Sequence, residues 1–372
     1  MKLGLGLYPH ILTDENFRFA RQAGATHIVA HLPGYSKTAS RPVPADQPWS
    51  LEELKALRGS INSAGLELAA IENFEPHHWS DVLLDGPRKV EQMAGLKTII
   101  RNMGQAGIPV MGYNFSFAGV YGRANGPWAR GGAKSVGYLQ ELAPPDDEIP
   151  LGTIWNMVVD PDAPAGTIGQ ISQEQLWSRF KWFLDELVPV AEEAGVRLAL
   201  HPDDPPLEQL RGTARLVWKP ELYRKVFDLH PSHANAAEFC QGTISEMVGE
   251  MDVYEAIETY TAAKKIAYVH FRNVKGKVPN YYEMFVDDGD VDMIQALRLY
   301  QARLRRSAHS GSHPRTRVRC ALACGDGVRA RLDARSHLDD RTGRVTARFS
   351  RWGRWQTNGI TNRASRPTDP NP

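Results

Sequence analysis

Three side chains that can bind a transition metal each end a short apolar run in the second half of the chain: His201, Cys240 and His270. Imidazole nitrogens and cysteine thiolates are ligands that many divalent transition metals accept. Neighbouring parallel strands lie about 5 Å apart, so side chains at the ends of adjacent strands can converge on one ion. Three protein ligands would leave a coordination position open for a substrate, which is typical of catalytic metal sites.

Further polar side chains that follow or flank apolar runs could transfer protons or bind a polar substrate. Three of them are candidate acids or bases: Tyr113, His78 and His10. Four are candidate substrate contacts: Asn114, Arg130, Arg272 and Asn273. A single residue of any of these types is more often a packed polar group, so these predictions depend on the residues' positions near strand ends. Cys320 and Cys324 have a zinc-like spacing without a second pair, and we expect no metal there.

Alternating apolar runs and amphipathic segments would have to position these side chains. Seven runs read as buried parallel strands: Leu3–Leu7, His27–Leu32, Leu66–Ile71, Pro109–Phe115, Val196–Leu200, Ala236–Phe239 and Ile266–Phe271. Seven segments read as helices: 13–23, 50–64, 88–106, 172–194, 219–228, 252–263 and 290–300. Regular alternation of this kind predicts an α/β fold, a (β/α)₈ TIM barrel. An open doubly wound sheet is the alternative, although no glycine-rich phosphate loop follows the first strand.

The longest interruption of this pattern follows the fourth predicted strand, at residues 116–171, and is rich in glycine, proline and aromatic residues. Loops that follow strands lie on the catalytic face of a barrel. A loop with Arg123, Arg130 and Lys134 could therefore cover an anionic substrate, or it could be a surface excursion without a catalytic part.

The composition is that of an ordinary globular protein, with 372 residues, 42% hydrophobic residues and a formal net charge of +1. We expect no membrane span, because no window of about 18 uncharged apolar residues occurs. Three cysteines, an odd number, argue against a disulfide framework and for a reducing cytoplasm. Charge is uneven along the chain, because residues 301–372 contain 16 Arg and 5 Asp but no Lys or Glu.

Several strings resemble D-mannonate dehydratases over roughly residues 1–300. They are RNMGQAGIPVMGYNF (101–115), WNMVVDPDAP (155–164), HPDDPP (201–206), EFCQGT (238–243), YVHFRNVKGKVPNY (268–281) and GDVDM (289–293). The resemblance implies a xylose-isomerase-like TIM barrel and a cytoplasmic lyase of glucuronate catabolism. Its reaction would convert D-mannonate to 2-keto-3-deoxy-D-gluconate with Mn²⁺ or Fe²⁺. His201, Cys240 and His270 match the family's metal-binding residues, and the partner would be a small sugar acid, without a membrane or nucleic acid; a homo-oligomer stays open.

The chain departs from this family after Tyr300. The family continues with an eighth strand that ends in Pro-Asp-His, which supplies a metal-binding Asp and a catalytic His. Here residues 301–372 read as an Arg-rich tail without that string, which resembles translation in a shifted frame. We therefore expect a catalytic barrel in residues 1–300 without a normal eighth strand, a poorly ordered tail in 301–372, and weakened metal binding and turnover. The alternatives are a sugar isomerase or epimerase of the same barrel class, or an inactive barrel with a nucleic-acid-binding tail.

Overall fold

The computed structural model describes residues 1–33, 47–309, 319–322, 337–338 and 345–346. The chain separates into two compact units, residues 1–330 and residues 331–372. In the second unit, the described residues form one antiparallel pair, β17 (His337–Leu338) with β18 (Val345–Thr346). Most of the tail predicted to be poorly ordered lies outside the described residues, so that expectation stays a prediction.

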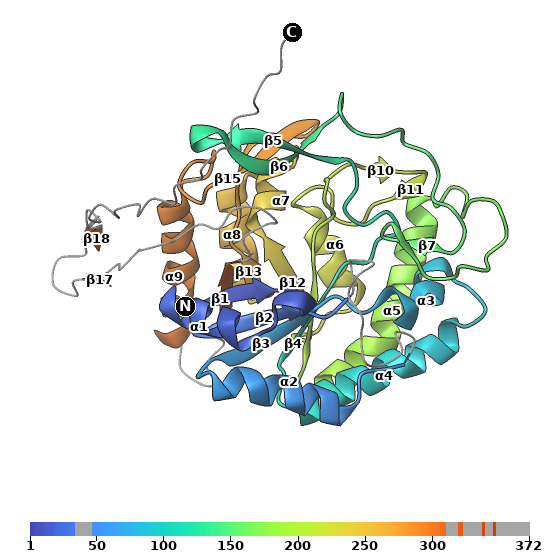
Figure 1. Cartoon of the computed structure of the whole chain (residues 1–372), viewed down its shortest axis with the longest axis horizontal. Coiled ribbons are helices and arrows are strands. Elements are labelled where there is room, and N and C mark those ends of the chain that lie inside the picture. The colour runs from blue at the N-terminus through green and yellow to red at the C-terminus, as the bar shows by residue number, and fades with distance from the viewer. Residues whose placement is uncertain (34–46, 310–318, 323–336, 339–344, 347–372) are drawn as a thin grey trace, which may run out of the picture. The chain divides into compact units, whose positions relative to one another are not determined.

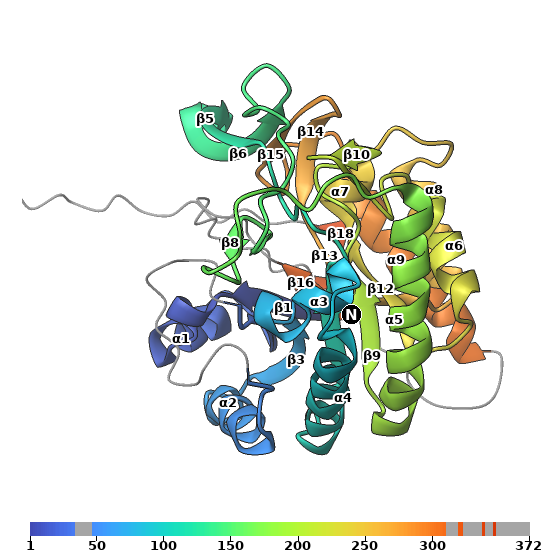
Figure 2. The same ribbon diagram turned by 90° about the vertical axis from the view of Figure 1, so that its right-hand side faces the viewer.

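Eight parallel strands close into a barrel in the first unit, as Figure 1 and Figure 2 show from two sides. In chain order they are β1 (Lys2–Leu7), β2 (His27–His31), β3 (Glu67–Glu72), β4 (Val110–Tyr113), β9 (Arg197–Leu200), β12 (Asn235–Cys240), β13 (Ile266–His270) and β16 (Arg319–Leu322). All seven strands predicted from the sequence are present, with ends shifted by one or a few residues. The barrel fold is confirmed.

The eighth strand comes from the Arg-rich segment, so the prediction of an open barrel is wrong. Cys320 of β16 pairs in parallel with Leu3 of β1 on one side and with Val269 of β13 on the other. Unpaired backbone groups on the edges of β1 and β13 favour capture of any short extended segment within reach. The run Arg319-Cys-Ala-Leu was overlooked because arginines surround it and it is only four residues long.

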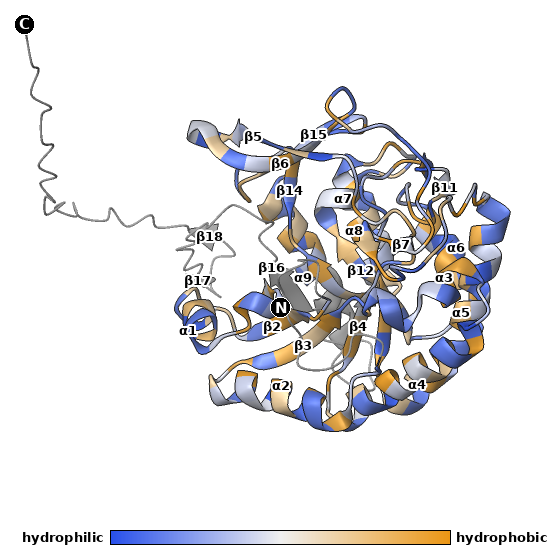
Figure 3. Cartoon of the chain, turned by 45° about the vertical axis from the view of Figure 1, so that its right-hand side comes forward, coloured by the Kyte–Doolittle hydropathy of each residue, from blue (hydrophilic) through white to orange (hydrophobic). Residues whose placement is uncertain are grey.

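Helices cover the outside of the barrel strands. They are α1 (Asp14–Gln22), α2 (Leu51–Ser63), α3 (Ser80–Leu84), α4 (Lys89–Gln105), α5 (Gln173–Ala194), α6 (Leu222–Leu229), α7 (Gln241–Glu246), α8 (Val253–Ala262) and α9 (Met293–His309). Polar and apolar residues alternate along α2 and α4 in Figure 3, as expected for helices with one face on the strands. None of the helices in the described part of the chain is long and apolar enough to cross a membrane.

Residues at the two ends of α5 explain where this helix begins and ends. The Ser172 hydroxyl accepts from the Gln175 amide while the Gln175 side chain accepts from the Ser172 amide, which completes a capping box. Gly195 closes the helix in the left-handed conformation, with φ of 67°. The following strand, β9, begins two residues later and delivers His201 just beyond its last residue.

Alternate positions of the strands fill the inside of the barrel in layers. One layer is made of small residues and one tyrosine: Val29, Ala69, Ala70, Val110, Ala199, Ala236, Ala267 and Tyr268. The inward positions above this layer, toward the carboxyl ends of the strands, include His31, Glu72, Gly112, His201 and Glu238. A Cβ atom on Gly112 would lie 2.3 Å from the Tyr268 hydroxyl and 2.8 Å from Glu238 Oε2, so only glycine fits there.

The long interruption after β4 folds into structure of its own above one end of the barrel (Figure 1). Strands β5 (Arg123–Ala129) and β6 (Ala133–Leu139) join β14 (Asn273–Lys277) and β15 (Asn280–Met284) in a four-stranded antiparallel sheet of order β14-β15-β6-β5. Smaller pairs are β7 (Thr153–Ile154) with β8 (Met157–Val158) and β10 (Gln209–Leu210) with β11 (Thr213–Ala214). Single 3-10 turns are Pro9–Ile11, Pro76–His78 and Arg130–Gly132. The sheet lies at the carboxyl end of the strands, where the loop was predicted.

Candidate metal centre

The three predicted metal-binding side chains meet at the carboxyl ends of neighbouring strands. His201 follows β9, Cys240 ends β12 and His270 ends β13, and these strands are adjacent in the barrel. One ligand atom from each residue lies within 4.8 Å of the others. The Cys240 Sγ and His270 Nδ1 atoms are 3.4 Å apart, and the two imidazole ring centres are 6.2 Å apart. This is the arrangement that a single bound ion requires.

Electrostatics within the triad favour the ligand form of the cysteine. Burial opposes ionisation of Cys240, but the His270 and Arg272 cations outweigh burial and lower the pKa of the Cys240 thiol well below its usual range. Burial also opposes a charge on His201, but the Cys240 thiolate and Glu238 raise the pKa of His201 to about 10. Thiolate sulfur and imidazole nitrogen together suit Fe²⁺, Mn²⁺ or Zn²⁺, so these residues fit a divalent transition metal.

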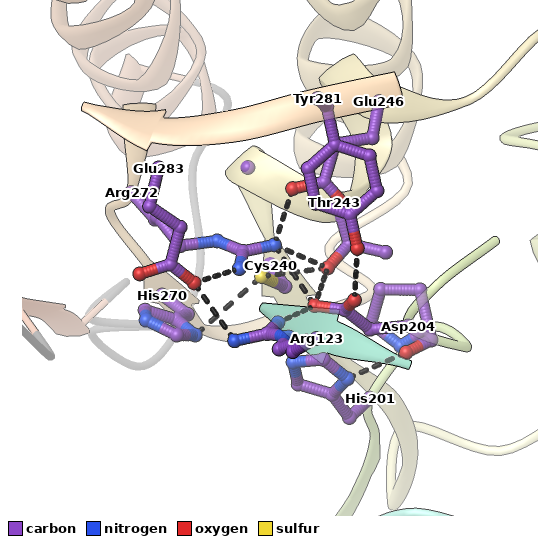
Figure 4. A network of polar contacts seen from close by, with 12 residues as sticks. Arg123, His201, Asp204, Cys240, Thr243, Glu246, His270, Arg272, Tyr281 and Glu283 are labelled. Atoms are coloured by element: carbon purple, nitrogen blue, oxygen red, sulfur yellow. Dashed lines mark hydrogen bonds and ion pairs between the residues drawn. The ribbon is translucent and has the colours of Figure 1, made fainter. Parts of the chain in front are cut away.

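A second layer of contacts holds the cysteine in place, as Figure 4 shows. The Thr243 hydroxyl lies 3.1 Å from Cys240 Sγ, one turn along from it at the start of α7. Arg272 Nη2 donates to the Thr243 hydroxyl oxygen at 3.0 Å, so the hydroxyl proton is left for an acceptor such as the sulfur or Asp204 Oδ2. Contacts of this kind orient first ligands and commonly alter metal affinity.

The Arg272 guanidinium is engaged in buried ion pairs and does not reach into open space, as a substrate contact would. Its guanidinium donates to Glu246 at 2.7 Å, to Asp204 at 3.0 Å and to Glu283 at 2.5 Å. Arg123 of β5 adds ion pairs to Asp204 and Glu283 (Figure 4). The network ties the sheet above the barrel to the strand ends; in the structure Arg272 supports this network, and its role as a substrate contact stays a prediction.

A histidine and a glutamate that sequence reasoning missed lie on the opposite wall of the barrel. His31 ends β2 and Glu72 ends β3, and His31 Nδ1 is 3.5 Å from Glu72 Oε1. The Tyr268 hydroxyl donates to Glu72 Oε2 at 3.2 Å, and the Tyr8 ring stacks on His31 with centres 4.5 Å apart. Burial raises the pKa of Glu72, but His31, His201 and His270 outweigh it and lower that pKa. Their position as last residues of strands two and three is the signal that could have found them.

Two of the predicted acids or bases lie among aromatic side chains. Tyr113 is fully buried, and its ring packs on Trp79 and Phe183, between the barrel and α5. Its place on β4, one residue after inward-facing Gly112, turns it outward, and burial raises the pKa of its phenol above the usual range. His78 packs edge-on against Trp49, and its Nε2 lies 2.8 Å from the Gln47 carbonyl oxygen. The structure does not bring either side chain to the metal ligands.

The remaining predicted residues divide between the barrel mouth and the surface. His10 is exposed and stacks on Tyr8, which in turn stacks on His31. Asn114 follows β4 on the inward-facing side, is 9% exposed, and its Oδ1 has no hydrogen-bond partner in the described part of the chain. Asn114 therefore keeps a free acceptor for a ligand.

Arg130 and Asn273 are occupied by partners within the protein. Arg130 lies at the exposed tip of the β5–β6 hairpin, paired with Asp287 at 3.1 Å. Asn273 donates to two backbone carbonyls and accepts from two backbone amides, so all its hydrogen-bonding positions are used. Asn273 is thus fully hydrogen-bonded within the protein and Arg130 is paired at the surface, and both substrate contacts stay predictions.

Comparison with known proteins assigns the barrel to a family. The sequence model of the D-mannonate dehydratase family (UxuA) matches residues 14–322. The mannonate dehydratase of Streptococcus pneumoniae is 31% identical over 273 residues, which is 70% of this chain and 73% of the relative. This chain belongs to the D-mannonate dehydratase family. Mannonate dehydratase 2 of Halalkalibacterium halodurans is also similar, with 26% identity over 68% of this chain and 75% of the relative.

A solved structure of the D-mannonate dehydratase family has the same fold. The crystal structure of mannonate dehydratase from Streptococcus suis serotype 2 superposes with a TM-score of 0.68 and 27% identity, over 86% of this chain and 82% of that chain. The family match ends at Leu322, the last residue of β16, and so extends past residue 300, where the resemblance seen in the sequence was expected to end. The sequence nevertheless contains no Pro-Asp-His string.

Proposed function

We propose that this chain is a hydro-lyase that removes water from D-mannonate to give 2-keto-3-deoxy-D-gluconate, with a divalent metal held by His201, Cys240 and His270. The observation that carries the proposal is the convergence of these three ligand atoms within 4.8 Å, at the carboxyl end of a barrel of the D-mannonate dehydratase family. Catalytic sites of such barrels lie at that end. Mn²⁺ or Fe²⁺ is the proposed ion.

The chemistry explains why a cation is needed at this position. Removal of the proton on C2 places negative charge beside a carboxylate that is already negative. When bound, the metal would offset that charge by coordinating oxygen atoms of the substrate. His201, Cys240 and His270 would hold the ion and leave at least one coordination position open. Thr243 and Arg272 would keep the Cys240 sulfur in position.

Asn114 is the proposed substrate contact among the predicted residues. Its Oδ1, which has no hydrogen-bond partner among the described residues, lies on the inward side at the end of β4, the strand next to β9. A sugar acid has several hydroxyl groups, and one of them could donate to this oxygen. His10, which is exposed and stacked on Tyr8, is kept as a proposed catalytic residue at the rim.

The first test is turnover by the full chain. Purified protein with Mn²⁺ should convert D-mannonate to a 2-keto acid that is detectable with semicarbazide, and a chelator should stop the reaction. No product with either Mn²⁺ or Fe²⁺ would contradict the proposed function. Because the Pro-Asp-His string is absent, we expect slower turnover than for a relative that contains it. We also propose a cytoplasmic location and no nucleic-acid partner, and salt-sensitive DNA binding would contradict the latter.

A sugar isomerase or epimerase of the same barrel class is the second candidate. Those enzymes typically hold their metal with carboxylates, whereas Cys240 provides a thiolate here, and that observation favours the dehydratase. Assays with aldose and ketose sugars in place of D-mannonate separate the two functions, since an isomerase would form a new sugar without loss of water.

A further inference from the structure

The structure places Tyr113 and His78, two of the predicted acids or bases, away from the metal ligands. Neither is therefore positioned to transfer a proton at the site. We infer that His31 and Glu72 form the acid–base pair of the site, facing the metal-binding residues across the mouth of the barrel. The inference rests on the proposed function, because it names the proton-transfer groups of that same site. It goes beyond the three ligands, which hold an ion but do not move protons.

The topology of the barrel places this pair opposite the metal ligands. Strand β2, which ends at His31, is four strands from β12 in either direction around the closed barrel, and β12 ends at Cys240. His31 and Cys240 both occupy inward positions above the same inner layer. Val29 precedes His31 on β2 and Ala236 precedes Cys240 on β12, and both belong to that layer. A substrate bound at the open coordination position would therefore lie between the metal ligands and His31.

The local contacts of His31 suit a proton-transfer group. Its Nδ1 faces Glu72 at 3.5 Å, and its ring is held by stacking on Tyr8. A carboxylate next to Nδ1 fixes which nitrogen carries the proton and stabilises the cation that forms when Nε2 takes up a second one. Glu72 is in turn oriented by the Tyr268 hydroxyl at 3.2 Å. Distances in such pairs often shorten only when substrate is bound.

The proposed step balances without an added reagent. Nε2 of His31 takes the proton from C2, and the electron pair of the C2–H bond stays on the substrate as an enolate. That electron pair then forms the double bond between C2 and C3 as the C3–O bond breaks. The protonated His31, stabilised by Glu72, gives this proton to the departing C3 hydroxyl, which leaves as water, so one proton leaves C2 and one joins the leaving oxygen. The resulting enol becomes the 2-keto acid by moving its hydroxyl proton to C3.

The same two strands contain a second histidine–glutamate pair that serves as a matched control. His27 begins β2 and pairs with Glu67, which begins β3, with Nε2 and Oε2 3.0 Å apart. Glu67 is 62% exposed and also binds Lys2, at the amino end of the strands. Catalytic groups of barrels lie at the carboxyl end of the strands. The His27–Glu67 pair therefore has the same two side-chain types at the end of the barrel where no reaction takes place.

The experiment compares His31→Gln, Glu72→Gln and His27→Gln in the full chain with Mn²⁺. For each variant we would measure D-mannonate turnover, exchange of the C2 proton in D₂O by NMR, Mn²⁺ affinity by calorimetry, and thermal stability. His31→Gln should lower kcat and C2 exchange by about 10²–10⁴-fold while Mn²⁺ affinity changes less than about threefold. Glu72→Gln should lower kcat less, because it supports His31. His27→Gln should keep kcat and lose only stability.

Two results would overturn the inference, and they can be told apart from failure of the proposed function. Turnover by folded His31→Gln within threefold of the unaltered chain would show that another group moves the proton. A loss of Mn²⁺ affinity equal to the loss of kcat would show that His31 acts through the metal site instead. If the unaltered chain gives neither product nor C2 exchange, the proposed function itself fails and the inference falls with it.

Discussion

Two arginines at opposite ends of the barrel, Arg197 and Arg272, are held in different ways. At the amino end, Arg197 donates four hydrogen bonds of 3.0–3.2 Å, all to backbone carbonyl oxygens of neighbouring strands and turns. At the carboxyl end, Arg272 donates to the buried side chains of Asp204, Glu246, Glu283 and Thr243. Backbone carbonyls are fixed by the fold, whereas the buried carboxylates depend on the side chains that pair with them, Arg272 and Arg123.

This difference indicates which end of the barrel is organised for function. Buried charges cost several kcal/mol each unless they are well paired, so a fold without a function has little reason to collect them. In this chain they surround Cys240, and the sheet above the barrel contributes Arg123 and Glu283 to them. The amino end is organised for stability and the carboxyl end for a site. Each prediction below tests this contrast.

The largest effect is expected at Cys240. Cys240→Ser should weaken Mn²⁺ binding at least about 100-fold and abolish turnover, because a hydroxyl is a far poorer ligand for a soft site. The protein should stay folded, since serine fills nearly the same space. Calorimetric titration with Mn²⁺ is the measurement. Arg197→Met at the amino end is the control, and it should lower thermal stability while Mn²⁺ affinity stays unchanged; full metal content in Cys240→Ser would contradict the ligand assignment.

Breaking the buried network should cost stability. Arg272→Met removes the partner of three buried carboxylates, and the free energy of unfolding should fall by about 3–5 kcal/mol. Arg130→Met removes an exposed ion pair with Asp287 and should leave the denaturation midpoint unchanged. Urea denaturation of both variants tests the prediction. Equal midpoints for the two variants would mean that the carboxyl-end network is no more important than a surface pair.

The hydroxyl beside the metal ligand should have a smaller effect. Thr243→Val removes the contact to Cys240 Sγ, and Mn²⁺ affinity should fall about 10–100-fold. Thr243→Ser keeps the hydroxyl and should retain nearly all of that affinity. With Co²⁺ as a probe, the sulfur-to-metal charge-transfer band should shift in Thr243→Val but not in Thr243→Ser. If both variants bind alike, the hydroxyl has no part in the site.

The pH dependence of metal binding should be the smallest effect when it is counted over one pH unit near neutrality. His201 has a pKa of about 10 without metal, so at pH 6–8 it carries a proton that a metal must displace. Mn²⁺ affinity should therefore rise with pH, by up to about tenfold per pH unit for each proton released. Titrations at pH 6, 7 and 8 test this. An affinity that does not change would show that the histidine is already neutral.

The sequence was sufficient for the features that depend on local pattern. Apolar runs and amphipathic periods predicted seven strands and their helices, and ligand types at strand ends predicted His201, Cys240 and His270. The strand β16 was missed because pairing with two existing edges can make a strand of a run too short and too basic to be recognised alone. That is a tertiary effect, which local propensity does not contain.

Side-chain direction and buried partners explain where the structure places the other predicted site residues. Tyr113 stands one position after Gly112, and a shift of one residue along a strand turns a side chain from the inside of the barrel to the outside. Asn273 and Arg272 follow the seventh strand as predicted, but partners far away in sequence, such as Glu283 and Val291, occupy them. His31 and Glu72 were visible as strand-end residues, yet only the closed barrel shows that they lie next to each other and opposite Cys240.

The central claim is that His201, Cys240 and His270 hold one divalent metal, and diffraction tests it most directly. Crystals of the full chain grown with Mn²⁺ should show one anomalous peak, measured near the manganese edge, about 2.0–2.4 Å from the two imidazole nitrogens and the Cys240 sulfur. That peak should vanish in Cys240→Ser. A peak at another place, or full occupancy in the serine variant, would contradict the account.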